Sequence, residues 1–493
     1  MENVSQHTIK INLPGGIVSP GDLQEILSIA EKSGAADLIF GNRQQLFFTV
    51  KEAQLEDLNH ELLMADIHYE MDADEYPNIM SSYVTDDIFD SPSWLREGVY
   101  KDIFDQFDFR PRLKINLVNS NQTFVPFFTG NLNFISSEVS NYWFLYVRFP
   151  KTNQLYCWPS LIYAEDISAI SKLIEHELLE NKDLFYDQPA INAELLYEKI
   201  AAKNSIVKQP IQQHLKLPDF QLPYYEGFNS YGNHKLWLGI YRRNESFAVN
   251  LLKDVCKICS KTRVGQLHVT PWKSLIIKGI EPKDRKYWGR ILDKYQINVR
   301  HASNELNWQL ENLCPEGLLL KQELVKQFEE ADLRTYRLSF AIKTHLKSGL
   351  FGSVIIRKII DEQEQVTFEI HHTRDFNPNT KDFIVYKINL KREQLGTELS
   401  DLCNTYYRLR LNQELEVLSE VAVEEASTKA EAYFVYQCKD CLTIYDQFWG
   451  DELNDIPAGT DFEDLSTYNC PTCDAPKEDF LAVEKQVATT IDA

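Results

Sequence analysis

Long apolar runs are missing from this sequence of 493 residues. No stretch of eighteen consecutive apolar residues occurs, so no segment is predicted to span a bilayer. The first residues, MENVSQHTIKINLPGG, also lack the basic and then apolar pattern of a secretion signal. We therefore expect a cytoplasmic protein without membrane contact.

An excess of positive charge is missing as well. The chain has 51 Lys and Arg against 73 Asp and Glu, a formal net charge of −22, and no basic cluster stands out. Such a chain repels the phosphates of nucleic acids and of anionic lipids. We expect no nucleic acid among its partners.

Cysteine is scarce, with nine residues in the whole chain, which excludes a disulfide framework. Four of the nine form two Cys-x-x-Cys pairs near the end, separated by 28 residues: Cys438, Cys441, Cys470 and Cys473. The spacing within a pair lets one tight turn aim both sulfurs at one point. Four converging thiolates suit zinc or a single iron, and their geometry alone does not separate the two metals.

The residues around these pairs resemble rubredoxin from about Tyr433 to Glu484. The resemblance includes the stretch IPAGTDFEDL and these further positions: Tyr436, Tyr445, Asp446, Gly450, Asp451, Tyr468 (usually Trp in the family), Pro471, Lys477 and Phe480. It implies one iron, Fe3+ or Fe2+, held by all four cysteines. A site closed in this way passes an electron and binds no substrate.

Two positions depart from the family. Leu442 and Asp474 stand where glycine commonly follows the second cysteine of each pair. The turn places this residue at positive φ, where a leucine costs about 1 kcal/mol or more. We expect the exchange to tune the N–H···S hydrogen bonds and, through them, the reduction potential of the metal. The small apolar core of this segment is expected to consist of five aromatic residues: Tyr436, Tyr445, Phe462, Tyr468 and Phe480.

The same segment is strongly acidic, with about twelve Asp and Glu against two Lys between Tyr433 and Glu484. One interpretation is an ordinary solvated surface. The other is a docking face for a basic patch on a redox partner protein, an electron donor reductase or an acceptor reductase.

The first 410 residues contain two stretches of one pattern, starting at Ile9 and at Leu236. Each gives a strand, an amphipathic helix, two strands and a second amphipathic helix. This is the pattern of a ferredoxin-like half-domain, and its repetition predicts a duplicated α+β protein.

This part resembles the sirohaem-dependent nitrite and sulfite reductases. The stretches that carry the resemblance are GNRQQLFF from Gly41, PRLKINL from Pro111 and VTPWKSLIIKGI from Val269. In the family such basic residues bind sirohaem carboxylates, so the resemblance implies that Arg43, Arg112 and Lys114 hold an anion or a tetrapyrrole. The alternative is that they form surface contacts or structural salt bridges.

The family's [4Fe–4S] cysteines are absent. Cys314 stands without a partner, the following stretch RLSFAIKTHLKSGLFGSV has none, and Pro77 replaces an arginine of the family. A single thiolate cannot hold a cubane, so we expect no [4Fe–4S] cluster. The loss of the cluster makes binding of sirohaem doubtful as well. Cys157, Cys256, Cys259, Cys314 and Cys403 are interpreted as packing residues. The adjacent His371 and His372 would point to opposite faces of a strand and receive no role.

Five segments follow from these observations: two reductase-like halves at 1–224 and 225–410, an acidic linker at 411–432, a rubredoxin domain at 433–485 and a tail at 486–493. The preferred hypothesis is an electron carrier rather than an enzyme, serving a nitrite or sulfite assimilation reductase. One alternative is a tetrapyrrole-binding oxidoreductase with a fused electron donor. The other is a zinc-binding regulatory protein.

Overall fold

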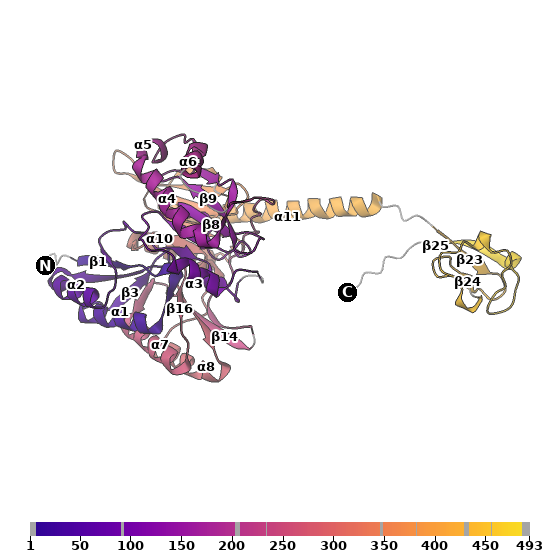
Figure 1. Ribbon diagram of the computed structural model, residues 1–493, viewed down its shortest axis with the longest axis horizontal. Helices are drawn as coiled ribbons and strands as arrows, with labels where there is room; N and C mark the ends of the chain where they lie inside the picture. The colour runs from indigo at the N-terminus through magenta and orange to yellow at the C-terminus, as the bar shows by residue number, and fades with distance from the viewer. Residues whose placement is uncertain are drawn as a thin grey trace. The chain divides into compact units, whose positions relative to one another are not determined.

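The computed structural model describes residues 6–89, 93–202, 208–232, 234–345, 349–380, 382–427, 433–454 and 456–485. The chain forms two compact units, residues 1–404 and residues 405–493 (Figure 1). No helix in the described ranges is both long and apolar enough to cross a membrane.

The first predicted half-domain is present in the front unit. Its elements are β1 (Gln6–Ile11), α1 (Pro20–Lys32), β3 (Asp37–Phe40), β4 (Leu46–Lys51), α2 (Leu55–Met64) and the short β5 (Glu70–Met71). Ser19 caps α1 by accepting a hydrogen bond from the backbone N–H of Asp22, and Pro20 occupies the first turn. The apolar face predicted for this helix is buried: Leu23, Ile26, Leu27 and Ala30.

The second half-domain repeats the order. Its elements are β13 (Gly227–Tyr231), β14 (Lys235–Ile240), α7 (Val249–Thr262), β16 (Leu267–Val269), β17 (Leu275–Ile280) and α8 (Arg285–Lys294). The buried face of α7 includes Cys256 and Cys259, which confirms their interpretation as packing residues.

The two half-domains exchange short strands. β2 (Ile17–Val18), just before α1, pairs with β16 of the second half, while β15 (Ser246–Ala248), just before α7, pairs with β3 of the first. The resulting sheets have the orders β15-β3-β4-β1-β5 and β13-β14-β17-β16-β2. Helices α1 and α7 lie side by side (Figure 1), and both halves share one hydrophobic core.

Each half-domain is followed by a further sheet, of seven strands after the first half-domain and of five after the second. The first sheet contains β6 (Met80–Ser81), β7 (Ile115–Val118), β8 (Leu132–Ser136), β9 (Tyr142–Arg148), β10 (Leu155–Cys157), β11 (Ser160–Tyr163) and β12 (Lys208–Pro210). Its helices are α3 (Glu97–Asp105), α4 (Ile167–Glu180), α5 (Lys182–Phe185) and α6 (Ala193–Ala201). The second sheet contains β18 (Trp308–Leu310), β19 (Phe340–Lys343), β20 (Val354–Ile360), β21 (Val366–Thr373) and β22 (Phe383–Leu390). Its helices are α9 (Ser303–Leu306), α10 (Pro315–Glu330) and α11 (Leu395–Ser427).

These two further sheets share a strand pattern. In the orders β6-β7-β8-β9-β11 and β18-β19-β20-β21-β22, the first two pairings are parallel and the last two antiparallel. The duplication therefore extends beyond the half-domains to the sheets that follow them.

The C-terminal unit holds a small antiparallel sheet of order β24-β23-β25, formed by β23 (Tyr433–Cys438), β24 (Ile444–Tyr445) and β25 (Phe480–Lys485). The predicted aromatic core is confirmed: Tyr445, Phe462, Tyr468 and Phe480 are buried, and Tyr436 packs against them. The rings of Tyr436 and Phe462 stack with centroids 4.1 Å apart. So small a core needs an additional staple.

Candidate functional site

The two Cys-x-x-Cys segments fold into matching turns. In the first, the N–H of Cys438 donates to the carbonyl of Thr443 (2.8 Å) and the N–H of Leu442 to that of Cys438 (3.0 Å). In the second, Cys470 donates to Ala475 (2.8 Å) and Asp474 to Cys470 (2.9 Å). Both pairs of sulfurs are therefore aimed by the same backbone device.

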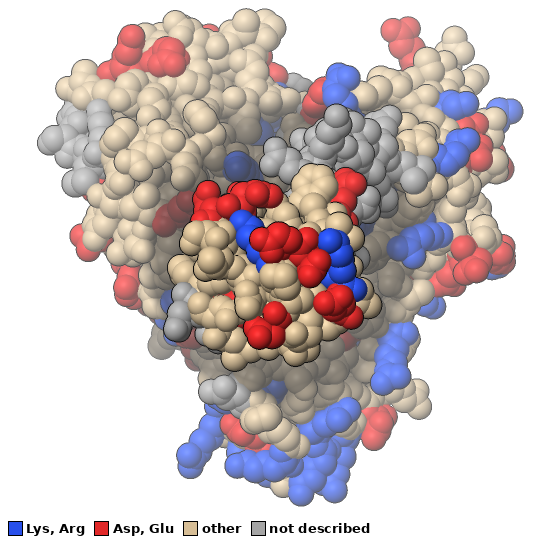
Figure 2. All heavy atoms as spheres, turned by 90° about the vertical axis from the view of Figure 1, so that its right-hand side faces the viewer, with Lys and Arg blue, Asp and Glu red and all other residues tan. Residues whose placement is uncertain are grey.

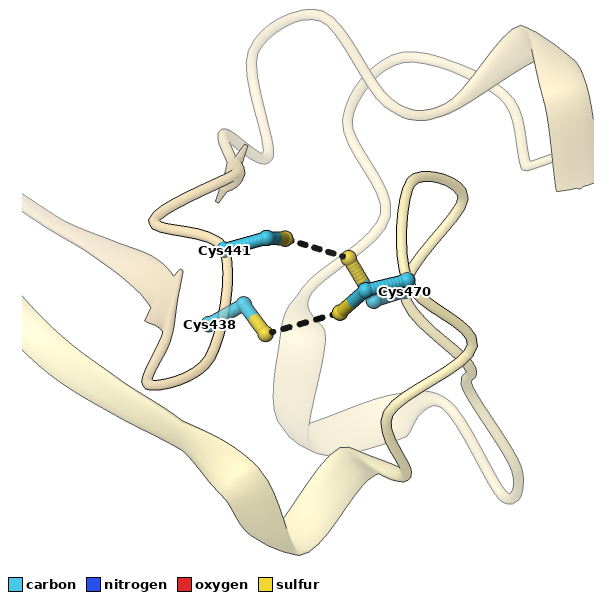
Figure 3. A group of neighbouring side chains, drawn as sticks. Cys438, Cys441 and Cys470 are labelled. Carbon is cyan, nitrogen blue, oxygen red and sulfur yellow. Dashed lines mark hydrogen bonds between the residues drawn. The ribbon is translucent and has the colours of Figure 1, made fainter.

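The four sulfurs of these turns converge on one point. Cys438 Sγ lies 3.6 Å from Cys473 Sγ, Cys441 Sγ lies 3.3 Å from Cys470 Sγ, and all four lie within 4.8 Å of one another (Figure 3). Four sulfurs about 2.3 Å from a metal would be spaced about 3.8 Å apart. The site therefore fits one tetrahedral ion, and every coordination position is taken by the protein.

Hydrogen bonds to sulfur favour the thiolate form at Cys441 and Cys470 but not at Cys473. The hydroxyl and the backbone N–H of Thr443 lower the pKa of Cys441 to about 6. Burial raises the pKa of Cys470, but the N–H groups of Thr472 and Cys473 outweigh it and lower the pKa. The N–H of Ala475 lowers the pKa of Cys473, yet hydrogen bonding with the other thiols, first that of Cys441, raises it to about 12. Four thiolates this close need a cation between them.

The two residues that depart from the family pattern have the predicted backbone. Leu442 has φ 63° and Asp474 has φ 60°, both in the left-handed region. Aspartate tolerates this region better than leucine. The side chain of Leu442 is 63% exposed, so packing does little to offset the strain.

We expect Leu442→Gly to raise the free energy of unfolding of the metal-loaded C-terminal unit by about 1 kcal/mol, because glycine adopts this backbone without strain. Denaturant titration of the full chain, followed by loss of the metal–thiolate absorbance, measures it. The matched control is Leu481→Gly, since Leu481 is also exposed (56%) but lies in β25 with ordinary backbone. Leu481→Gly should lower the free energy of unfolding. An equal decrease in Leu442→Gly would show that the side chain of Leu442 contributes more to stability than its backbone strain costs.

The basic residues predicted in the front unit do not all meet. Arg43 is buried, and its guanidinium donates to the carbonyls of Asn78 (2.9 Å) and Ile115 (2.8 Å) and to Asn116 Oδ1 (3.1 Å). Its neighbour Gln44 donates to the carbonyls of Ser81 and Val269. This stretch ties protein segments together.

Arg112 and Lys114 line a cavity of about 680 Å³. Arg43 does not line this cavity. Arg112 forms an ion pair with Glu75 at 3.0 Å. Burial, followed by the charge of Arg43, lowers the pKa of Lys114 to about 8. The structure thus brings two of the three predicted residues to one cavity.

Comparison with known proteins identifies the C-terminal segment. The rubredoxin family model matches residues 435–480. "Probable rubredoxin HupI" of Bradyrhizobium diazoefficiens is 45% identical over 49 residues, which are 10% of this chain and 71% of that protein. "Rubredoxin-2" of Chlorobaculum tepidum is 45% identical over 49 residues, again 10% of this chain and 94% of that protein. Through this domain, the chain belongs to the rubredoxin family.

Not every relative is covered so fully. The chain is 40% identical to "Rubredoxin-2" of Ectopseudomonas oleovorans over 57 residues, 11% of this chain and only 33% of that protein. The matches to these rubredoxins do not include the first four hundred residues, so they identify the rubredoxin domain alone.

The front unit is matched separately. The family model "Nitrite/Sulfite reductase ferredoxin-like half domain" matches residues 1–65. The NirA protein of Mycobacterium tuberculosis has a similar fold, with TM-score 0.58 and 13% identity over 80% of each chain. The predicted fold is thereby confirmed: a reductase-like α+β scaffold with ferredoxin-like half-domains, fused to a rubredoxin domain.

The rubredoxin site fits iron, because four sulfurs of tetrahedral spacing converge there. Within its described residues, the front unit offers no comparable set for a [4Fe–4S] cluster. In the described part of the chain, the four rubredoxin cysteines are the only group of three or more His, Cys, Asp or Glu with converging ligand atoms. The cavity lining contains seven Lys and Arg but no cysteine, so it fits carboxylates and does not fit a cluster.

Sequence reasoning missed most of the cavity. Its lining also includes Arg148, Lys343, Arg357 and His371, which come from strands far apart in the chain, and Lys151, which lies in the turn after β9. His371 and His372 do point away from each other, since His371 lines the cavity while the ring of His372 stacks on Phe376. No local motif marks these residues, so only the fold could bring them together.

Proposed function

We propose that this protein is a one-electron carrier whose rubredoxin domain exchanges electrons with partner proteins. The observation that carries the proposal is the convergence of Cys438, Cys441, Cys470 and Cys473 within 4.8 Å. An iron in this site would alternate between ferric and ferrous states. The four sulfurs fill its coordination sphere, exclude substrate and hold their positions, so that electron transfer needs little rearrangement.

The surface of the rubredoxin domain supports docking by charge. Its exposed carboxylates are Asp440, Asp461, Glu463, Asp464, Asp474, Glu478 and Glu484, and Figure 2 shows acidic side chains gathered on one face with few lysines. Such a face steers a basic partner toward it and raises the rate of encounter without tight binding. We propose that the partners are an electron donor reductase and an acceptor reductase.

We further propose that the front part does no chemistry and positions the rubredoxin domain on its acceptor, a reductase of nitrite or sulfite assimilation. The supporting observation is a nitrite/sulfite reductase-like fold without a described thiolate set for the cluster. The proposed segments are 1–224, 225–410, a linker at 411–432, 433–485 and a tail at 486–493. Helix α11 runs through this linker as far as Ser427.

The metal is tested by a visible spectrum of the purified chain together with metal analysis. We expect one iron per chain and the sulfur-to-iron charge-transfer bands of a ferric tetrathiolate, which bleach on reduction. Colourless protein with one zinc per chain, even when expressed with ample iron, would contradict electron transfer. That result would favour a zinc-binding regulatory protein.

The carrier role is tested by deleting residues 433–493 and measuring reduction of the acceptor reductase. We expect transfer to be lost in the deletion variant and, in the intact chain, to slow as salt rises, because salt screens steering. Unchanged reduction by the shortened chain would refute the role of the rubredoxin domain.

A second candidate function is favoured by the cavity cations. The seven Lys and Arg could hold the carboxylates of a tetrapyrrole, which would make the front part an oxidoreductase fed by the rubredoxin domain. An intense Soret-type band in the purified protein, with reduction of nitrite or sulfite, would support this candidate over the carrier.

A further inference from the structure

The cavity beside Arg112 and Lys114 lies between parts of the two duplicated sheets. From the first sheet, Lys114 immediately precedes β7 and Arg148 ends β9. From the second, Lys343 ends β19 and Arg357 lies on β20. A volume of about 680 Å³ is within the usual range of small-molecule sites.

The lining is dominated by cations. It has seven Lys and Arg (Arg112, Lys114, Arg148, Lys151, Lys182, Lys343 and Arg357) against two carboxylates, Asp74 and Glu75. In a chain whose net charge is −22, this is a local reversal of sign. A concave site with an excess of one charge concentrates ligands of the opposite charge.

Several of these charges are already balanced. Glu75 pairs with Arg112 at 3.0 Å, Asp74 pairs with Lys10 at 2.6 Å, and Arg357 lies 3.4 Å from Glu369. The two acidic residues of the lining are therefore occupied by other partners.

Among the described residues, five of the seven cations remain without a carboxylate: Lys151 and Lys182 are exposed, whereas Lys114, Lys343 and Arg148 are partly buried. In the described part of the chain, no ion pair within 4.0 Å involves Lys114, Lys343 or Arg148, and neither ammonium group has a hydrogen-bond partner. The guanidinium of Arg148 donates only to the neutral carbonyls of Gly130 (3.1 Å) and Thr129 (2.8 Å). These side chains thus carry uncompensated charge toward the cavity.

The three partly buried cations also act on one another. Burial and then neighbouring cations lower the pKa of Lys114 to about 8 and that of Lys343 to about 8, and Arg148 contributes to both shifts. Burial likewise lowers the pKa of Arg148 to about 10. Unpaired buried charge is costly, and a bound anion would relieve that cost.

We propose that this cavity binds a compact multivalent oxyanion, a small polycarboxylate or polyphosphate, held by Lys114, Lys343 and Arg148. Guanidinium and ammonium donors from opposite sides suit a ligand with several charged oxygens. No cysteine lines the cavity, and the Nε2 atom of its histidine, His371, is bonded to Glu369 at 2.9 Å. The lining therefore offers many anion donors and no cysteine thiolate for a haem iron. This proposal does not depend on the metal centre.

The test is calorimetric titration of the full-length, metal-loaded chain with citrate and with pyrophosphate at pH 7 and low salt. We expect Lys114→Met and Lys343→Met each to weaken binding at least tenfold. The matched control is Lys257→Met, an exposed lysine of α7 that lies outside the cavity. Binding of citrate alone would assign a polycarboxylate, and binding of pyrophosphate alone a polyphosphate.

Thermal unfolding separates a ligand site from a structural role. Without ligand, Lys114→Met should melt higher than the parent chain, because an unpaired charge is removed. With saturating citrate or pyrophosphate, the parent chain should gain stability and the variant should not. A structural lysine would instead give a lower melting temperature with or without ligand.

Affinity should also fall as the pH rises from 7 to 9, because each ammonium is charged below a pKa of about 8 and neutral above it. Lys114 faces Arg43, Asp74, Arg148 and Lys151, and Lys343 faces Arg148, Arg357 and Glu311. A bound anion favours the charged ammonium and so raises its pKa, which shifts the loss of affinity to higher pH.

Three results would overturn the proposal. The first is that neither citrate nor pyrophosphate binds. The second is that both lysine variants bind them as tightly as the parent chain does. The third is a Soret-type band in the purified protein that disappears in Lys343→Met, which would give the cavity to a tetrapyrrole.

Discussion

Replacing Cys470 by serine should reduce the iron content of the purified chain from one per chain to nearly none. Cys470 is buried, and its sulfur lies 3.3 Å from that of Cys441, so no water could substitute for it without rearrangement. Structural zinc sites in small peptides contribute roughly 10–16 kcal/mol, and we expect a contribution of similar importance from iron here. The aromatic core of the domain cannot replace that contribution, and we expect the rubredoxin domain of Cys470→Ser to unfold.

Metal analysis, the visible spectrum and near-ultraviolet circular dichroism measure these losses together. The control is Cys157→Ser, because Cys157 lies in β10 of the front unit, where its thiol donates to the carbonyl of Trp158 and is hydrogen-bonded to the hydroxyl of Tyr146. That variant should keep its iron and its spectrum. Full iron and an unchanged spectrum in Cys470→Ser would show that the four-cysteine site is not the metal centre.

The second large effect is expected at Arg43. Arg43→Met should lower the free energy of unfolding of the front unit by about 3–5 kcal/mol, because it leaves buried acceptors without donors. These acceptors are the carbonyls of Asn78 and Ile115 and the amide oxygen of Asn116. Burial lowers the pKa of Arg43 to about 9, so the group is still charged at pH 7.

Denaturant unfolding followed by tryptophan fluorescence measures the effect. Arg112→Met is the matched control, since its pair with Glu75 is half exposed on both sides and such pairs are worth about 0–1 kcal/mol. Equal, small losses in the two variants would count against a structural role for Arg43. Its implied role as an anion-holding residue would then regain support.

The rubredoxin domain could be predicted almost completely from the sequence. Its metal ligands follow a fixed spacing, its core is five aromatic residues in one short segment, and its turns force positive φ at Leu442 and Asp474. All of these signals are local. The structure adds the hydrogen bond from the hydroxyl of Tyr468 to Asp451 (2.7 Å), made at a position where the family usually has tryptophan.

The front part was predictable only to the level of its half-domains. Helices α1 and α7 are predicted by apolar residues at every third or fourth position. The exchanged strands β2 and β15 have two and three residues, too few for any period to appear. Most of the cavity cations could not be predicted for another reason. Each of them stands alone in the sequence, and only the packing of two sheets brings them together.

The reciprocal exchange of β2 and β15 makes the two halves of the front unit inseparable. Each half completes the other's sheet, so a cut between them would strip an edge strand from both and expose unpaired backbone to aggregation. The two halves of the front unit are therefore expected to fold and unfold as one body.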